Sequence, residues 1–396
     1  MIFYACLQRR VRKMQKRDVY LDNAATSHPK PECVLKAAYA AMTDFNANPG
    51  RSGHRRALEA ARAVLAAREA VAAVLGAADP FCVAFAFNCT DALNLAIKGV
   101  LRAGDHVIST LLEHNSVLRV LSEMLRREEI ELTLLAPRPD GFIDPEDVRR
   151  ALRKNTRLIA LTHASNVTGA IQPVAAVGQV AREAGVTFLV DGAQALGAMP
   201  VDVNALACQL YAFPGHKSLL GPQGTGGLYI APGLELAPLR EGGTGSSSES
   251  MLQPTERPER YESGTLNLPG IAGLGAGAEY VRKGLSQIFM REREVTTALY
   301  EGLREIAGVD VYAPDEEAAR AGIVSFNAGD LTSAQAADYL DREGIAVRGG
   351  LHCAPGAHHF LGTLERGAVR ASVGHATSFE DVEALLRAVK KMLREA

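Results

Sequence analysis

The sequence predicts an α/β fold in two parts: a large domain with a mainly parallel sheet flanked by helices, and a smaller α+β domain at the C-terminus. Short apolar segments alternate with helical patterns between residues 57 and 190, as expected of parallel strands joined by crossover helices. This alternation stops at a stretch rich in Gly, Ser and Pro, Gly242 to Gly264. With 396 residues, 47% of them hydrophobic, the chain is long enough for two cores.

The first 17 residues differ in composition from the rest of the chain. They contain six Lys or Arg and no acidic residue, and their only apolar run, Ile2 to Leu7, is too short for the core of a signal peptide. We expect residues 1–17 to be a basic, disordered extension, or the product of an early start codon with Met14 as the alternative start. A basic anchoring arm is the other interpretation.

Apolar spacing locates the elements of the large domain. An Ala-rich segment with helical spacing, Ala57 to Leu75, predicts a long helix. Four short apolar runs predict buried strands: Val83 to Phe87, Asp105 to Ser109, Leu158 to Thr162 and Val186 to Val190. Further helices are expected at Asp91 to Leu101, Ser116 to Arg127, Pro145 to Leu152 and Val174 to Ala184.

The second half of the chain is organised differently. Gly242 to Gly264 lacks periodicity and predicts a long loop, which at that length is usually functional or mobile. Gly270 to Ile306 predicts one long helix or two consecutive ones, and Phe379 to Arg394 a final helix. We therefore expect a cofactor-binding domain at residues 18–275 and a smaller domain at residues 276–396.

Composition argues against several classes of partner. The formal net charge is −2, so the sequence lacks the basic stripe typical of nucleic-acid binding. No apolar run reaches the roughly 20 residues of a membrane helix. The six cysteines show no CxxC spacing, which is typical of a protein of the reducing cytoplasm rather than of a disulfide framework.

Asp191 and Lys217 give the clearest chemical signal. Asp191 ends the apolar run VTFLV, and the carboxyl ends of strands are where open α/β sheets bind ligands. Lys217 follows in a loop between Phe213-Pro214-Gly215 and a glycine run at residues 221–227. Either residue alone is commonly just a solvated charge. Together they match the needs of pyridoxal 5′-phosphate (PLP), whose ring nitrogen pairs with a carboxylate and whose aldehyde forms a Schiff base with a lysine.

A phosphate site is predicted at residues 87–94. Cys89 and Thr90 open a helix after a strand, so their backbone N–H groups and the Thr90 hydroxyl could bind a phosphate. An ordinary N-cap is the alternative and the commoner case. The glycine run at residues 221–227 is not a dinucleotide fingerprint, because it leads into the strand-like segment Leu228 to Ile230.

Three further residues are candidates for chemistry. His114 follows a strand end and could cover a planar cofactor or cap the next helix. Cys353 lies in a loop with Gly on both sides, which favours an exposed nucleophile over a buried packing residue. Arg370 follows soon after and suits a carboxylate, although a surface salt bridge is the alternative. Zinc at His352, Cys353, His358 and His359 lacks a second ligand pair, so we expect no metal.

Ten motifs in register resemble the class V aminotransferase superfamily of fold-type I PLP enzymes, and within it the cysteine desulfurases of the SufS/NifS-like type. From Tyr20 onward they are YLDNAATS, NPGRSGH, NCTDALN, EHNS, SNVTGAIQPV, DGAQ, GHKSLLGPQGTGG, ESGTLN, RGGLHCAP and VRAS. The short Cys353 loop is similar to that of the SufS-like branch. The strings around Arg51 and Lys217 are most similar to a less-studied side branch of the family.

The resemblance implies a role for each matching residue. Lys217 would bind PLP, Asp191 would pair with the ring nitrogen, and His114 would stack on the ring. Gln194 and Asn166 would contact the ring hydroxyl or the substrate. The phosphate would be held by the helix start at Cys89 and by Thr90, His216 and, from a second subunit of a homodimer, Thr265. Arg370 would bind the substrate carboxylate and Cys353 would accept the sulfur. Arg51 and His54 match a motif near the site entrance.

Two positions depart from the family pattern. Pro214 stands where relatives usually carry a Ser that donates to the phosphate, and Pro offers neither a hydroxyl nor a backbone N–H. The loss of one charged hydrogen bond, worth roughly 1.5–3 kcal/mol, would weaken PLP binding unless another group replaces it. Cys89 stands where the better-known enzymes carry Thr.

The resemblance implies conversion of L-cysteine to L-alanine, with the sulfur left on Cys353 as a persulfide. A selenocysteine lyase or another class V aminotransferase or lyase is the alternative, and a transaminase would need no thiol at Cys353. A non-catalytic scaffold is disfavoured because Lys217, Asp191, Cys353 and Arg370 are all present. The sulfur-acceptor protein and the pathway, such as iron–sulfur cluster assembly or tRNA thiolation, stay open.

Overall fold

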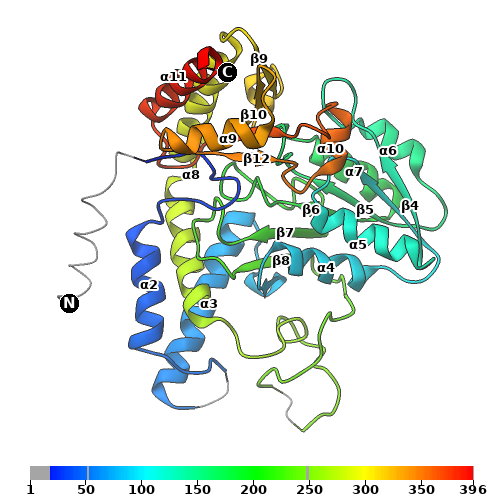
Figure 1. Cartoon of the computed structure of the whole chain (residues 1–396). Helices are drawn as coiled ribbons and strands as arrows, with labels where there is room; N and C mark the ends of the chain where they lie inside the picture. The colour runs from blue at the N-terminus through cyan, green and yellow to red at the C-terminus, as the bar shows by residue number, and fades with distance from the viewer. Residues whose placement is uncertain (1–17, 51–52, 247–248, 396) are drawn as a thin grey trace.

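The computed structural model describes residues 18–50, 53–246 and 249–395. The expected basic extension at residues 1–17 and Arg51 lie outside them. Figure 1 shows a large unit built on a central sheet, with a smaller unit above it formed mainly by the C-terminal part of the chain. Within the described residues, no helix is both long and apolar enough to cross a membrane.

The central sheet has seven strands in the spatial order β2-β8-β7-β6-β5-β3-β4. Every neighbouring pair is parallel except the two pairs that involve β8. The sheet is therefore mainly parallel, as predicted. Its strands are β2 (Val83–Ala86), β3 (Asp105–Thr110), β4 (Ile130–Leu135), β5 (Thr156–Thr162), β6 (Thr187–Asp191), β7 (Leu210–Pro214) and β8 (Gly226–Ile230).

Both faces of this sheet are buried, which explains why its strands are continuous apolar runs. On β6, Phe188 and Val190 belong to one hydrophobic cluster and Leu189 to another, because successive side chains point to opposite faces. The first cluster includes α3 (Arg55–Leu75) and α7 (Val174–Ala184). The second includes α4 (Cys89–Val100) and α5 (Asn115–Arg126). A short helix, α6 (Pro145–Ala151), lies between β4 and β5 in the chain.

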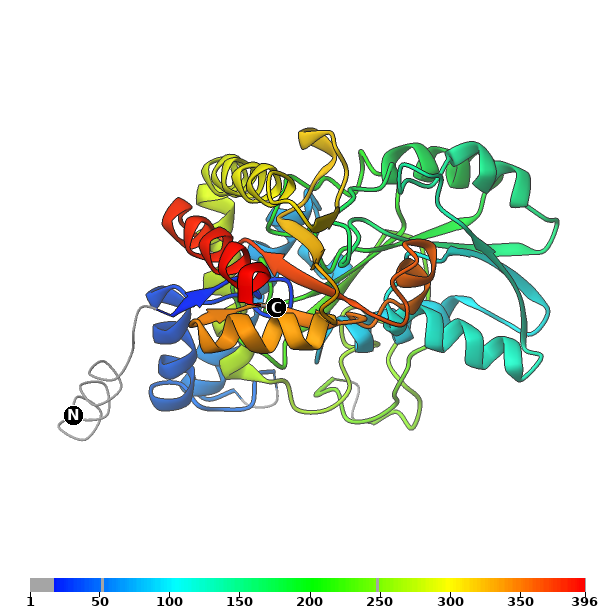
Figure 2. The ribbon, with the colours of Figure 1, turned by 45° about the horizontal axis from the view of Figure 1, so that its top comes forward.

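The smaller unit has an antiparallel sheet in the order β12-β13-β10-β9. A third hydrophobic cluster joins this sheet to the helices beside it and to β1. Figure 2 shows the orange and red helices of this unit beside its strands. The elements are β9 (Val309–Tyr312), β10 (Ile323–Ala328), β12 (Arg348–Gly350), β13 (Ala368–Ser372), α9 (Ser333–Arg342), α10 (Pro355–Phe360), α11 (Phe379–Glu395) and the parallel pair β1 (Val19–Tyr20) with β11 (Ile345–Ala346).

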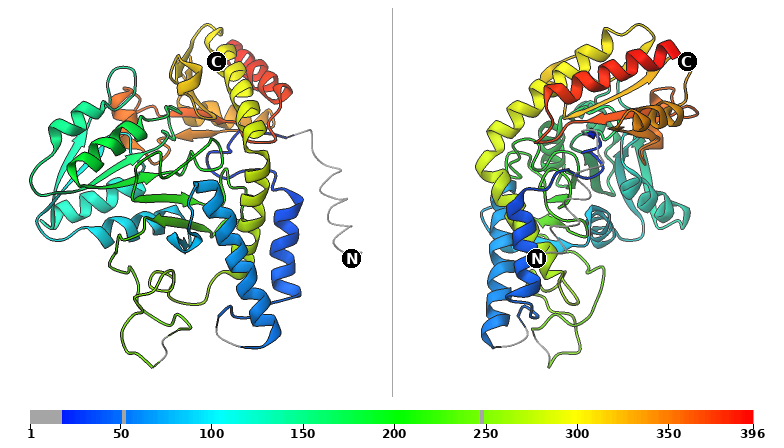
Figure 3. Two further views of the ribbon diagram at one scale, coloured as in Figure 1. Left: turned by 180° about the vertical axis from the view of Figure 1, so that it is seen from behind. Right: turned by 60° about the vertical axis from the view of Figure 1, so that its left-hand side comes forward.

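One long helix connects the two units. α8 (Leu268–Arg304) is continuous over 37 residues, which decides between the one or two helices expected from the sequence. Its first half packs beside α2 (Glu32–Thr43) and α3, and its second half enters the core of the smaller unit (Figure 3). The predicted loop at Gly242 to Gly264 contains no helix or strand among its described residues.

The other predicted elements agree with the structure to within two residues at each end. Two strands of the central sheet were not predicted, β4 and β7. β4 is an edge strand whose side chains are mostly half-exposed, so it lacks a continuous apolar run. β7 is fully buried but ends at Pro214, and proline is a residue that a sequence pattern assigns to a loop.

Candidate active site

A cavity of about 210 Å³ opens at the carboxyl ends of the parallel strands, between the two units. Thr162, Asp191 and Pro214 are the last residues of β5, β6 and β7, and all three line it. The cavity also brings together ten of the eleven site residues predicted from the sequence. They are Cys89, Thr90, His114, Asn166, Asp191, Gln194, His216, Lys217, Cys353 and Arg370.

Asp191 lies at the floor of this cavity and is 4% exposed. Its Oδ1 accepts hydrogen bonds from the backbone N–H of Ala193 at 2.9 Å and from Sγ of Cys89 at 3.6 Å. Gly192 is required behind it, because a Cβ there would lie 2.0 Å from the ring of buried Tyr211. A buried carboxylate of this kind needs a cationic or N–H partner.

Lys217 is held in place through its own backbone. Ser27 Oγ donates to the Lys217 carbonyl at 2.8 Å, and Lys30 Nζ donates to the His216 carbonyl at 2.8 Å. Burial lowers the pKa of Lys217, an effect that Cys89 and Asp191 oppose. A lowered pKa favours the neutral amine, which is the form that can act as a nucleophile or a base.

The expected phosphate site lies at the start of α4. Asn88 is the N-cap and its Oδ1 accepts from the Asp91 N–H at 2.9 Å, so the ordinary cap is present. Cys89 and Thr90 still line the cavity, and the Thr90 hydroxyl bonds to Ser116 Oγ at 2.7 Å. His216 Nδ1 is buried without a partner among the described residues.

His114 caps α5, which confirms the capping interpretation, and it also lines the cavity, whereas its covering of a planar cofactor stays a prediction. Its Nδ1 accepts the Ser116 backbone N–H at 3.0 Å, which places any ring proton of the neutral form on Nε2. Burial lowers the pKa of His114, although the charge of Asp191 acts against this. The ring is therefore a neutral wall of the cavity at physiological pH.

The loop that carries Cys353 has a defined and strained conformation. His352 and Cys353 have φ angles of 50° and 57°, in the left-handed region that costs about 1–2 kcal/mol per non-glycine residue. Their carbonyl oxygens are both fixed, because Asn166 Nδ2 donates to His352 at 2.6 Å and the Asn115 N–H donates to Cys353 at 2.7 Å. The Cys353 side chain itself is exposed.

The His352 side chain anchors this loop from below. It is 4% exposed, and its Nε2 donates to the Ala368 carbonyl at 3.0 Å because a carbonyl can only accept. Burial, followed by the charge of Arg370, lowers the pKa of His352 to about 3. The ring also packs beside His358, with centroids 5.5 Å apart. His352 is therefore neutral and structural.

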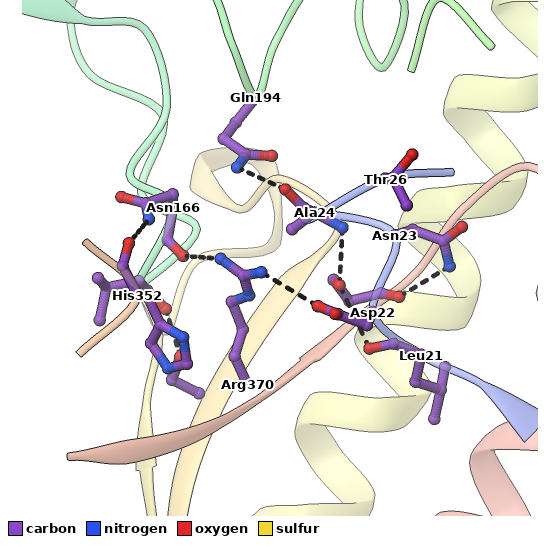
Figure 4. A network of polar contacts seen from close by, with 12 residues as sticks. Leu21, Asp22, Asn23, Ala24, Thr26, Asn166, Gln194, His352 and Arg370 are labelled. Carbon is purple, nitrogen blue, oxygen red and sulfur yellow. Dashed lines mark hydrogen bonds and ion pairs between the residues drawn. The ribbon is translucent and has the colours of Figure 1, made fainter. Parts of the chain in front are cut away.

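Arg370 reaches the cavity from β13 and is 2% exposed (Figure 4). It donates to the Asn166 carbonyl at 3.0 Å and to Asp22 Oδ1 at 3.1 Å, whereas its Nε is buried with no partner among the described residues. Gln194 Nε2 donates to the Ala24 carbonyl at 3.2 Å. The segment around Asp22 therefore holds the Arg370 side chain in position. No role was predicted for this segment from its own residues.

The segment from Asp22 to Lys30 is the main part of the site to which the sequence patterns assigned no role. Its Asp22 accepts a hydrogen bond from Arg370, and its Ser27 and Lys30 donate to the backbone carbonyls of Lys217 and His216. The motif YLDNAATS contains most of this segment. The family resemblance therefore included it, although no chemical role was predicted for its residues. Arg348 also lines the cavity from β12 and had no predicted role.

Thr265 is the one predicted site residue that does not reach this cavity. It is exposed and lies at the end of the long loop, beside a smaller cavity shared with Asp91 and Arg240. The end of this loop is fixed by a buried ion pair, in which Arg68 and Glu262 make two contacts of 2.6 and 2.8 Å. His54 caps α3 and does not line the cavity.

The donor set fits PLP. Asp191 suits a protonated ring nitrogen, Lys217 an aldehyde, and the α4 terminus with the unpartnered His216 Nδ1 a phosphate. Pro214 does line the wall, so a Ser donor is absent at that position. In the described part of the chain no three His, Cys, Asp or Glu side chains are grouped to hold a metal.

Comparison with known proteins identifies the family. The model of the family described as aminotransferase class-V matches residues 19–385. A probable cysteine desulfurase of Methanothermobacter thermautotrophicus is 36% identical, covering 93% of this chain and 92% of that protein. A cysteine desulfurase of Salmonella agona is 34% identical, over 95% of this chain and 93% of the relative.

Solved structures agree with this assignment. The apo structure of cysteine desulfurase from Thermococcus onnurineus NA1 is similar with a TM-score of 0.90 and 34% identity, covering 96% of this chain and 95% of the other. The cysteine desulfurase CsdA of Escherichia coli gives 0.84 and 28%, with coverages of 96% and 95%. The chain therefore belongs to the PLP-dependent class V aminotransferase family and, within it, to the cysteine desulfurases.

Proposed function

We propose that this protein is a PLP-dependent cysteine desulfurase that converts L-cysteine to L-alanine and leaves the sulfur on Cys353. One observation carries the proposal: an exposed thiol, Cys353, shares a cavity with Lys217, Asp191 and Arg370. A transaminase has no use for that thiol. The stoichiometry balances, because the Cys353 thiol becomes a persulfide as the substrate Cβ exchanges its sulfur for a hydrogen.

PLP, when bound, supplies an electron sink that weakens bonds next to the substrate α-carbon. We assign the remaining work to side chains of the chain. Arg370 would bind the substrate carboxylate through a guanidinium already oriented by Asp22. Lys217, in its neutral form, would take the proton from Cα, and Asp191 would hold the proton on the ring nitrogen.

Cys353 would then attack the substrate sulfur as a thiolate, which is nucleophilic even when only partly ionised. The attack breaks the Cβ–S bond and forms the S–S bond of the persulfide. A soft nucleophile at an exposed position suits the next step, because the persulfide must be handed to an acceptor. We infer a sulfur-acceptor protein that approaches this exposed loop, with iron–sulfur cluster assembly as one pathway that would use it.

We also propose a cytoplasmic homodimer in which Thr265 completes the phosphate site of the partner subunit. Thr265 lies away from the cavity of its own chain, at the end of a loop fixed by the buried Arg68–Glu262 pair. A residue presented in this way is free to serve another subunit. Sedimentation should give a dimer, and a fully active monomer would contradict the proposal.

The first hydrophobic cluster includes the first half of α8 and the third cluster its second half, which supports a division within α8, near residue 275, into a PLP-binding domain and a small domain that carries Cys353. β1 packs with the smaller unit, so we would assign residues 19–21 to it in this proposal. The division places the cofactor residues on one unit, and Cys353 and Arg370 on the other.

The activity is tested directly on purified protein. PLP should be visible by its absorbance, and L-cysteine with a reductant should yield alanine and sulfide in equal amounts. The same assay with L-selenocysteine measures the preference between the two substrates. Bound PLP together with amino transfer to a keto acid, and no alanine from cysteine, would contradict the proposal.

A further inference from the structure

Cys89 is in contact with the carboxylate at the cavity floor. It is the first residue of α4, and its Sγ lies 3.6 Å from Asp191 Oδ1. The Ala193 N–H donates to the same oxygen at 2.9 Å. Oδ1 therefore has two donors, whereas no residue in the described parts of the chain donates a hydrogen bond to Oδ2. Asp191 lines the cavity, so Oδ2 is the oxygen that is available to a ligand there.

The Cys89 thiol is held in its protonated form. A helix N-terminus usually lowers the pKa of a cysteine. Here burial and the charge of Asp191 have the opposite effect and raise the pKa of Cys89 well above its ordinary value, although Lys217 acts against them. A carboxylate can only accept, so the S–H of Cys89 is the donor in this contact.

We propose that Cys89 is a positioning residue for Asp191, which together with the Ala193 N–H holds Oδ1 and so directs Oδ2 toward the ring nitrogen of the cofactor. This inference rests on the proposed function, in which Asp191 binds that nitrogen. The terminal torsion of Asp is broad and weakly restricted. Two donors on one oxygen fix the plane of the carboxylate, and Cys89 does so without touching the substrate.

The test compares Cys89→Ser, which keeps a donor, with Cys89→Ala and Cys89→Val, which remove it. We expect PLP to bind roughly three- to tenfold more weakly to the Ala and Val variants, the size expected for one modest hydrogen bond. The Ser variant should stay within about twofold. The direct readout is the ¹⁵N resonance of ¹⁵N-labelled PLP in each holoenzyme, which should report loss of the ring proton at lower pH in Ala and Val only.

Two controls separate this effect from packing. Cys33→Ala removes an exposed thiol on α2 and should change neither readout. In an Asp191→Asn background, Cys89→Ala should not weaken PLP binding further, because the carboxylate that it positions is gone. A packing defect would persist in that background.

The outcomes distinguish this inference from the function beneath it. If the wild-type enzyme binds no PLP, or binds it without a protonated ring nitrogen, the proposed function fails. If the wild type behaves as expected and the Ala, Val and Ser variants all match it, only the role of Cys89 is overturned. Sulfur found on Cys89 by mass spectrometry after cysteine treatment would also overturn it, since a positioning thiol must stay unmodified.

Discussion

The two sides of the cavity, one formed by the central sheet and the other by the Cys353 loop, differ in the burial of their side chains. Asp191 ends the buried strand β6, and Lys217 lies in the loop after β7, where Ser27 and Lys30 donate to the carbonyls of Lys217 and His216. Cys353 lies on a loop of the smaller unit, exposed and at a left-handed φ of 57°. In the proposed mechanism, the groups that hold the cofactor are those fixed by the sheet, whereas the group assigned to receive sulfur and pass it on faces solvent.

We expect the largest effect from removing Lys217, on the side of the cavity formed by the central sheet. Lys217→Ala should abolish the absorbance of lysine-bound PLP and lower turnover by at least roughly a thousandfold, because the proposed mechanism uses this one side chain as attachment point and base. Alanine production and the visible spectrum measure both effects. Lys98→Ala, at an exposed position on α4, is the matched control and should behave as wild type. Persistent turnover in Lys217→Ala would show that the base is elsewhere.

Cys353→Ser changes only the exposed thiol on the loop of the smaller unit. PLP should stay bound with unchanged affinity, while alanine production from cysteine falls by roughly a hundredfold or more, since a hydroxyl is a far poorer nucleophile toward sulfur. Mass spectrometry of the wild type after cysteine treatment should find one added sulfur on the peptide containing Cys353. Undiminished desulfuration in the variant, with Cys33→Ser as control, would remove Cys353 from the mechanism.

His352→Ala removes the buried anchor of the Cys353 loop. We expect turnover to fall by about tenfold with PLP binding unchanged, because the strained loop loses the hydrogen bond from the His352 ring to the Ala368 carbonyl. The rate at which iodoacetamide alkylates Cys353 should change in parallel, which a loss of cofactor geometry would not cause. His359→Ala, on an exposed neighbour, is the control. Equal alkylation rates in both variants and the wild type would contradict an anchoring role.

The smallest effect concerns Glu113, a buried residue that does not line the cavity. Its Oε1 accepts from Thr110 Oγ1 at 2.8 Å and from the Thr162 N–H at 3.0 Å, and its Oε2 is buried without a partner in the described chain. Burial raises the pKa of Glu113 from 4.5 to about 8. The native state therefore binds an extra proton between these pH values, and its free energy of unfolding should fall as pH rises from 4.5 to 8.

Glu113→Gln should remove this part of the pH dependence, because the amide cannot ionise. Thermal unfolding at several pH values between 5 and 8 compares the slopes, and the variant should be flatter than the wild type. Glu365→Gln, on an exposed side chain, should keep the wild-type slope. Parallel curves for all three proteins would mean that Glu113 does not titrate in this range.

The sequence by itself determined the element pattern of the large unit and the identity of ten cavity residues. Strands buried on both faces are continuous apolar runs, and site residues follow their carboxyl ends, so Asp191 could be placed from VTFLV alone. The strand β7 was not predicted because it ends at a proline, and β4 because this edge strand carries no continuous apolar run.

Tertiary structure alone decided which long-range contacts complete the site. Asp22 orients Arg370 across 348 residues of chain, and Cys89 meets Asp191 across 102. Local patterns carry no information on such pairs, because the fold and not the spacing brings them together. The same holds for the left-handed backbone at Cys353, whose strain persists only because Asn166, Asn115 and the buried His352 ring restrain it from separate elements.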